Sequence, residues 1–153
     1  MRRVAVLQML LAGFLAAEAG AQQLPMAVAR LVDRQGQEVG VVQLQEVPGR
    51  GVMLRLEVNG LLQGSHGIQI HPVGRCDDAF EGSGVRGARS ANLTTGDLGT
   101  LTVPRPGRIE IEKLARRVTL MEGAPNSLLD SDGSAVLIFG DDGAPAVCGV
   151  IQR

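Results

Sequence analysis

The chain has 153 residues, a length that favours a single domain. Its formal net charge is −1, and its aromatic side chains are three Phe, with no Trp or Tyr. A near-neutral chain so poor in aromatic residues lacks the basic surface and the stacking groups of a nucleic-acid binder, so we expect no nucleic-acid partner.

Residues 1–21 have the pattern of a bacterial signal peptide. Two arginines follow the initiating Met, residues 4–17 are almost wholly apolar, and residues 19–21 (Ala-Gly-Ala) supply a small-x-small cleavage pattern. A membrane anchor is the weaker interpretation, because the apolar run is short for a bilayer and no stop-transfer pattern follows it. We therefore predict that residues 22–153 form the mature domain, periplasmic or secreted, with no membrane span after cleavage.

The mature chain predicts antiparallel β-structure. Apolar and polar residues alternate in short runs, as in residues 52–58, and turn-like sequences rich in Gly, Asp and Pro separate the runs. Strands at this spacing are typical of a sandwich or barrel with one buried face. The predicted strands are residues 26–33, 39–47, 52–58, 67–71, 108–112 and 134–139.

Two segments lack a clear strand pattern. Residues 74–99 are polar and Gly-rich, and a loop of that length inside a compact domain is usually functional or derived from something functional. Residues 113–121 carry a weak helical pattern, for which an irregular crossover is an equally good interpretation.

The predicted export bears on the state of the two cysteines, Cys76 and Cys148. An oxidising compartment favours a disulfide between them over a thiol nucleophile or a metal ligand pair, and two free buried thiols are the alternative. A disulfide would close most of the mature chain into one loop, which stabilises the fold by roughly 4 kcal/mol in the chain-entropy model.

Short motifs along the mature chain occur in a recognisable order. They are residues 64–71 (Gly-Ser-His-Gly-Ile-Gln-Ile-His), the five-residue step to Cys76, residues 96–99 (Gly-Asp-Leu-Gly) and residues 148–151 (Cys-Gly-Val-Ile). Together they resemble the copper/zinc superoxide dismutases, and the spacing to Cys76 resembles the periplasmic bacterial branch. The resemblance implies an all-β fold, an eight-stranded Greek-key β-barrel, with both cysteines where the family keeps its disulfide.

The resemblance also implies a set of metal ligands that this chain lacks. In the family, four histidines hold copper and one of these bridges to zinc, which two further histidines and an aspartate complete. Imidazole nitrogen suits copper, and several imidazoles keep the metal bound while it changes oxidation state. The present chain contains two histidines in total.

Single positions show which ligands are lost. Gln69 replaces the second histidine of the family motif, His71 retains the third, and Phe139 stands at about the position of the last copper histidine. Asp97 falls where the zinc aspartate belongs, but no histidine occurs between Cys76 and Asp97. His71 and Asp97 are thus vestigial positions from two different sites, and they cannot build either centre.

The substrate side of the family's site is also reduced. Eight residues separate Phe139 from Cys148, too few for the family's electrostatic loop. Pro145 stands where the family has the arginine that guides superoxide. We therefore assign no catalytic residue and expect no cofactor, neither copper nor zinc.

Other roles follow for the remaining polar residues. By alternation His66 points to the core with Ile68 and Ile70, and the resemblance implies a structural histidine that hydrogen-bonds across loops. We expect His71 to be a partly exposed inherited residue and Asp97 to brace its own loop.

The sequence is compatible with three functions. The first is a non-catalytic domain that acts through an unknown protein partner, a homodimer or an unknown ligand. The second is residual metal handling by Gln69, His71 and Asp97, with Met53 or Met121 close to them in space. The third is a working dismutase whose missing ligands come from another chain.

Overall fold

The computed structural model describes residues 23–77, 80 and 96–153. The predicted signal peptide, residues 1–21, lies outside the described residues, as does most of the predicted long loop. In the described part, no helix is long and apolar enough to cross a membrane. The eight strands are β1 (Met26–Asp33), β2 (Glu38–Val47), β3 (Gly51–Val58), β4 (Gly64–His71), β5 (Asp97–Val103), β6 (Ile109–Ala115), β7 (Ala135–Phe139) and β8 (Pro145–Gln152).

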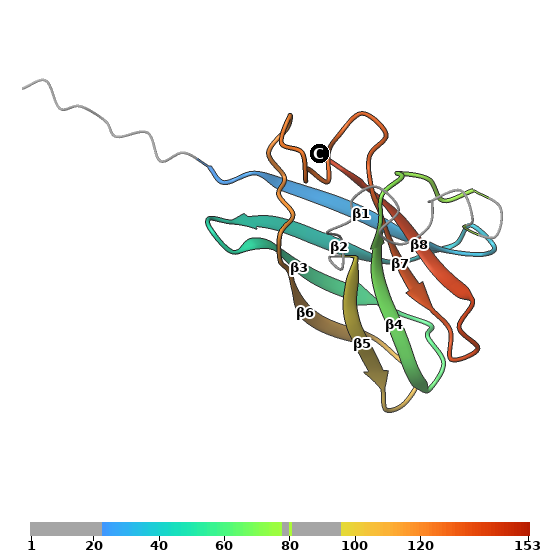
Figure 1. Ribbon diagram of the computed structural model, residues 1–153. Coiled ribbons are helices and arrows are strands. Elements are labelled where there is room, and N and C mark those ends of the chain that lie inside the picture. Colours follow the sequence, from blue (N-terminus) through green and yellow to red (C-terminus); the bar gives the residue numbers. More distant parts are fainter. Residues whose placement is uncertain (1–22, 78–79, 81–95) are drawn as a thin grey trace, which may run out of the picture.

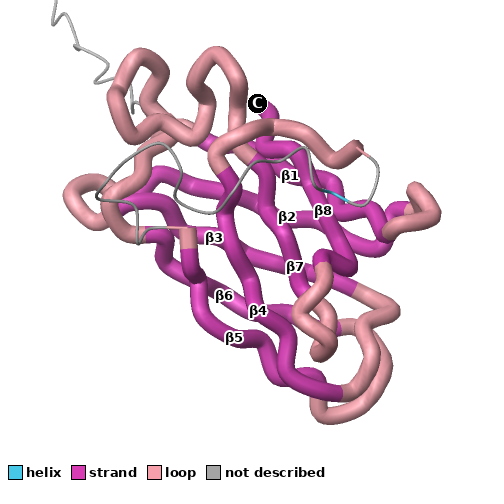
Figure 2. Tube along the Cα trace, turned by 45° about the vertical axis from the view of Figure 1, so that its right-hand side comes forward, coloured by secondary structure: helices cyan, strands magenta, loops and turns pink. Residues whose placement is uncertain are grey.

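The strands form one antiparallel sheet that wraps into a nearly closed barrel (Figures 1 and 2). Their order is β5-β4-β7-β8-β1-β2-β3-β6, so that β3 pairs with β6 and β4 pairs with β7. The two edge strands meet at the seam, where Lys113 Nζ in β6 donates a hydrogen bond to the Thr100 carbonyl oxygen in β5 (3.0 Å). The predicted eight-stranded barrel is confirmed.

The inward side chains of the barrel form its hydrophobic core. In β3 the four apolar residues of the predicted alternation are 0–3% exposed, whereas the residues between them lie on the outer face. Burial of each such Val or Leu contributes about 1.5–3 kcal/mol, which selects this register over one shifted by a single residue. The largest fully buried side chains in this core are Leu31, Leu44, Leu54, Ile68, Leu120 and Ile138.

Close contact between β8 and β1 explains the glycine that follows Cys148. A Cβ atom at Gly149 would lie 2.7 Å from the Arg30 carbonyl oxygen in β1. No larger residue fits there without separating the two strands. The C-terminal motif is therefore determined partly by backbone packing in the barrel.

The helical interpretation of residues 113–121 is wrong. The first three of these residues complete β6, and the chain then crosses the end of the barrel without a helix. Thr119 forms an isolated bridge with Ser127, and the Leu128 amide donates to the Thr119 carbonyl oxygen (2.9 Å). Val118 and Leu120 are buried in the core while Met121 is 57% exposed, so the apolar spacing reflects an irregular crossover.

Candidate functional site

The positions of the vestigial metal ligands lie on the outer face of the barrel, across β5, β4, β7 and β8. Asp97 is paired with Gln69, Gln69 with Leu137, and Leu137 with Cys148. Directly opposed residues in a sheet project from the same face, so these four side chains form one row. The barrel therefore does bring Gln69 and Asp97 together.

This outer face is largely apolar. Besides the core inside the barrel, a second cluster of buried side chains lies on it, which we call the outer cluster. Two of its members, Ala135 and Leu137, belong to β7, whose first four residues are fully buried. Apolar neighbours cannot coordinate a metal ion. The outer cluster consists of Phe80, Ala135, Leu137 and Cys148, with Val32, Cys76 and Phe139 packed against it.

His71 lies at the edge of this cluster and is buried, with 8% of its surface exposed, rather than partly exposed as expected. Its Nε2 atom lies 3.2 Å from Gln69 Oε1, and its ring centroid lies 6.1 Å from that of Phe139. An amide oxygen accepts hydrogen bonds, so Nε2 is the donor and carries a proton. A metal ion at Nε2 would have to displace this proton and its hydrogen bond to Gln69.

Asp97 begins β5 and is exposed. Its Oδ1 atom accepts a hydrogen bond from the Gly99 amide (2.8 Å), the contact of a residue that braces its own turn. Among the residues the structure describes, no group of three or more His, Cys, Asp or Glu side chains is arranged to hold a metal ion. One imidazole, one amide and one exposed carboxylate do not fit the copper and zinc sites that the resemblance implies.

Met53, one methionine of the metal-handling hypothesis, is not placed to complete this set. It projects outward from β3, and at least two strands separate β3 from β4 in either direction around the barrel. Met121 is exposed in the crossing segment after β6. Met53 is therefore not part of a cluster around His71.

His66 points into the barrel and is 3% exposed. Its Nδ1 atom lies 2.8 Å from the Phe139 carbonyl oxygen, and its Nε2 atom lies 2.8 Å from the Leu62 carbonyl oxygen. These contacts link the segment before β4 to the end of β7. They hold the backbone of Phe139, at the position of the lost copper ligand, against β4.

Cys76 and Cys148 form a disulfide with an S–S distance of 2.03 Å, as predicted. The bond joins the segment after β4 to β8, across 72 residues of sequence. It lies beside the outer cluster, in which Cys148 is fully buried. The disulfide therefore anchors the same face of the barrel that carries the vestigial ligand positions.

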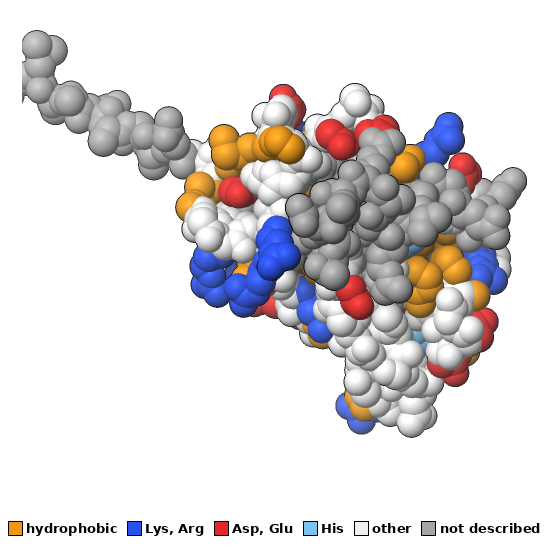
Figure 3. All heavy atoms as spheres, in the orientation of Figure 1, with side chains coloured by type: hydrophobic (Ala, Val, Ile, Leu, Met, Phe, Trp, Pro, Cys, Tyr) orange, Lys and Arg blue, Asp and Glu red, His pale blue; other side chains and the backbone are white. Residues whose placement is uncertain are grey.

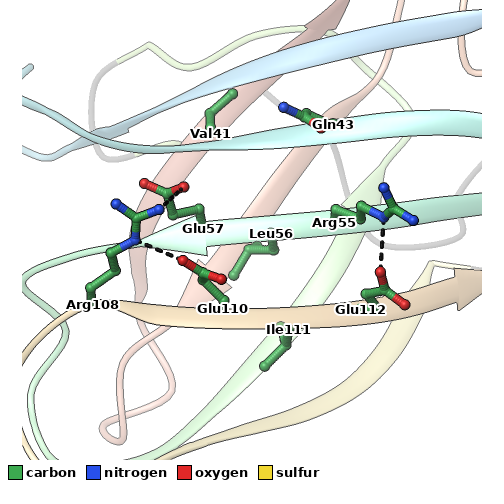
Figure 4. Close-up of a pocket in the computed structure, with 9 residues that line it drawn as sticks. All are labelled: Val41, Gln43, Arg55, Leu56, Glu57, Arg108, Glu110, Ile111 and Glu112. Carbon is green, nitrogen blue, oxygen red and sulfur yellow. Dashed lines mark hydrogen bonds and ion pairs between the residues drawn. The ribbon is translucent and has the colours of Figure 1, made fainter.

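A hollow of about 340 Å³ on the outer face of β2, β3 and β6 is a second candidate (Figure 4). Arg108 binds both Glu57 (2.6 Å) and Glu110 (2.8 Å), and Arg55 binds Glu112 (2.8 Å). Each charged side chain in this hollow thus has a partner of opposite sign, which is the arrangement of a solvated sheet surface. The sequence showed these charges, but the pairs between β3 and the β6 segment depend on the register of these two strands.

The fold, the disulfide and the outer-face row define a superoxide dismutase-like barrel. Residues 38–151 match the family model described as copper/zinc superoxide dismutase (SODC). The chain therefore belongs to the copper/zinc superoxide dismutase family.

Relatives of this chain include a protein named superoxide dismutase-like and a protein named superoxide dismutase. The superoxide dismutase-like protein YojM of Bacillus subtilis is 29% identical, with 80% of this chain and 74% of that protein covered. A superoxide dismutase [Cu-Zn] of Caulobacter vibrioides is 30% identical, with 76% of this chain and 80% of that protein covered.

Solved structures of a SOD-like protein and of a Cu/Zn superoxide dismutase resemble this barrel. A double mutant of a SOD-like protein from Bacillus subtilis, in which histidine replaces a tyrosine and a proline, is 29% identical with a TM-score of 0.71. The match covers 82% of this chain and 97% of that one. The Cu/Zn superoxide dismutase from Brucella abortus, at 18% identity and a TM-score of 0.60 over 84% of this chain and all of that one, shares the fold.

Proposed function

We propose that this protein is an exported superoxide dismutase-like domain that does not dismutate superoxide and acts through binding or as a structural component. The observation that carries the proposal is the donor set on the outer face. Gln69 and Phe139 occupy positions where the family resemblance implies copper ligands, and His71 Nε2 donates a hydrogen bond to Gln69.

The chemistry of dismutation supports this proposal. The metal must remain bound in two oxidation states, which in this family requires several imidazole nitrogens. The whole sequence contains two histidines, and one of them, His66, points into the core. A single imidazole beside an amide and a phenyl ring cannot supply such a site.

The relatives support the loss of activity in part. One is called superoxide dismutase-like, and a solved double mutant of a SOD-like protein from the same organism has histidine introduced at two positions. The Caulobacter vibrioides relative is called a superoxide dismutase [Cu-Zn], so membership of the family alone does not decide activity. The side chains present at the site decide which metals the protein can hold.

Export is the second part of the proposal. The pattern of residues 1–21 and the disulfide between Cys76 and Cys148 both fit an oxidising compartment. In that compartment a barrel stabilised by a disulfide can serve as a scaffold for a protein partner or for a second copy of the chain.

A dismutase assay tests the proposal. The protein is purified from the periplasm, incubated with copper and zinc, and dialysed, and the Caulobacter vibrioides relative is treated in the same way as a positive control. We expect the decay of superoxide to be no faster than in dialysed buffer, because no copper is retained. Activity per mole comparable to that of the relative would refute the proposal.

A further inference from the structure

Three arginines surround a hollow at one end of the barrel. Arg50 lies in the turn between β2 and β3, and Arg116 and Arg117 directly follow β6. The hollow has a volume of about 480 Å³ and is lined also by Glu46 and Asn126; we call it the arginine hollow. Lys and Arg side chains gather on the left of Figure 3, where Figure 1, in the same orientation, has the β2–β3 turn and the end of β6.

The arginine hollow is distinguished by three cations around one depression that have no ion pair among the described residues. Elsewhere in the described residues, arginines of β1, β3, the β5–β6 turn and the C-terminus bind carboxylates at 2.6–3.3 Å. Arg50, Arg116 and Arg117 are exposed, and none of them has an ion-pair partner among the described residues. Three like charges around one hollow attract a multivalent anion.

The one carboxylate at the hollow does not neutralise them. Glu46 is 9% exposed, and its Oε2 atom accepts hydrogen bonds from the Leu120 amide (2.7 Å) and from Thr119 Oγ1 (3.0 Å). These donors hold the Glu46 carboxylate against the segment that crosses the end of the barrel after β6. The carboxylate forms no ion pair with the three arginines among the described residues. Three guanidinium groups thus stand against one carboxylate that is already hydrogen-bonded.

The backbone holds the arginines in place. Arg117 has φ 66, a left-handed conformation that residues other than glycine rarely adopt, and Asn126 Nδ2 donates a hydrogen bond to its carbonyl oxygen (2.6 Å). Gly51, at φ 117, packs directly on the Ala115 carbonyl oxygen, where a Cβ atom would collide. An unusual conformation that its surroundings enforce is often found at functional sites.

We propose that the arginine hollow binds phosphate groups, either of a soluble phosphate compound or of a lipid headgroup. The planar guanidinium group donates several hydrogen bonds in a geometry that matches phosphate oxygens, and a bound phosphate relieves the repulsion between the three cations. The hollow is built from the β2–β3 turn and the segment after β6, and it shares no residue with the outer cluster. The inference therefore holds whether or not the protein dismutates superoxide.

Calorimetric titration with inorganic pyrophosphate at low ionic strength tests this site. We expect one saturable site, and Arg116→Gln or Arg50→Gln should each weaken it about threefold to fivefold, the loss of one exposed charge pair. Arg105→Gln is the matched control, because Arg105 is exposed in the β5–β6 turn and also has no ion pair among the described residues. It should change the affinity by less than about twofold. Circular dichroism establishes that all variants are folded.

Vesicles distinguish the two sources of phosphate. If a lipid headgroup is the ligand, the protein sediments with phosphatidylglycerol vesicles but not with phosphatidylcholine vesicles, and the Arg50→Gln/Arg116→Gln variant does not. If a soluble compound is the ligand, pyrophosphate binds and neither kind of vesicle does. The proposal is overturned if neither probe binds, or if Arg105→Gln weakens binding as much as Arg116→Gln.

Discussion

Replacing Cys76 and Cys148 by alanine is expected to lower the free energy of unfolding by about 4 kcal/mol. The disulfide joins residues 72 apart, and in the chain-entropy model a loop of that size restricts the unfolded chain by this amount. Alanine is the suitable replacement because Cys148 is fully buried in the outer cluster, where a hydroxyl would lack a partner. The loss is a large fraction of the 5–15 kcal/mol that is typical of natural domains.

Urea denaturation measures this loss, with circular dichroism as the signal because the chain contains no Trp or Tyr. As a control, a reducing agent should lower the stability of the native protein to that of the double variant and leave the variant unchanged. A difference below about 1 kcal/mol between native protein and variant would mean that the disulfide does not restrict the unfolded chain as the model requires.

Replacing His66 by alanine is expected to cost about 3 kcal/mol of stability. The change removes both contacts of the imidazole ring, leaves the carbonyl oxygens of Leu62 and Phe139 without these partners, and creates a cavity in the core. The loss appears as a lower midpoint of urea unfolding.

His66→Leu separates the two contributions, because leucine fills much of the same space but donates no hydrogen bond. We expect its cost to be about half that of alanine, since the unpaired carbonyl oxygens remain and the cavity does not. If both variants unfold within about 1 kcal/mol of the native protein, His66 does not tie β4 to the end of β7.

Strands in which apolar and polar residues alternate regularly between clear turns could be predicted from the sequence. Two other strands could not. The first strand was predicted with its observed bounds, because apolar and polar residues alternate between clear turns. The strands Asp97–Val103 and Pro145–Gln152 were not predicted. The strand Asp97–Val103 begins inside the predicted loop, which ends at Gly99, and the strand Pro145–Gln152 combines Pro and Gly with apolar residues on both faces.

The candidate site was predictable in its chemistry but not in its packing. The types of side chain at Gln69, His71 and Phe139 are visible in the sequence, and so is the shortage of imidazole. The burial of His71 and the outer cluster depend on which strands are neighbours. One signal was available: residues 135–139 are continuously apolar, a pattern of strands buried on both faces.

The arginine hollow could not be predicted from the sequence. Arg50 and Arg116 belong to turns far apart along the chain, and they meet because β3 pairs with β6, with Val52 opposite Ala115. The absence of ion pairs there, among the described residues, likewise follows from strand register, which places the available carboxylates elsewhere.

Metal content after loading tests the central claim most directly. The protein, purified from the periplasm, is incubated with copper and zinc, dialysed and analysed by elemental mass spectrometry, with the Caulobacter vibrioides relative as the control that should retain metal. We predict well below one equivalent of either metal, because His71 is the one imidazole on the outer face and the sequence offers no third histidine. A full equivalent of retained copper would contradict this account and return dismutation or metal transport to first place.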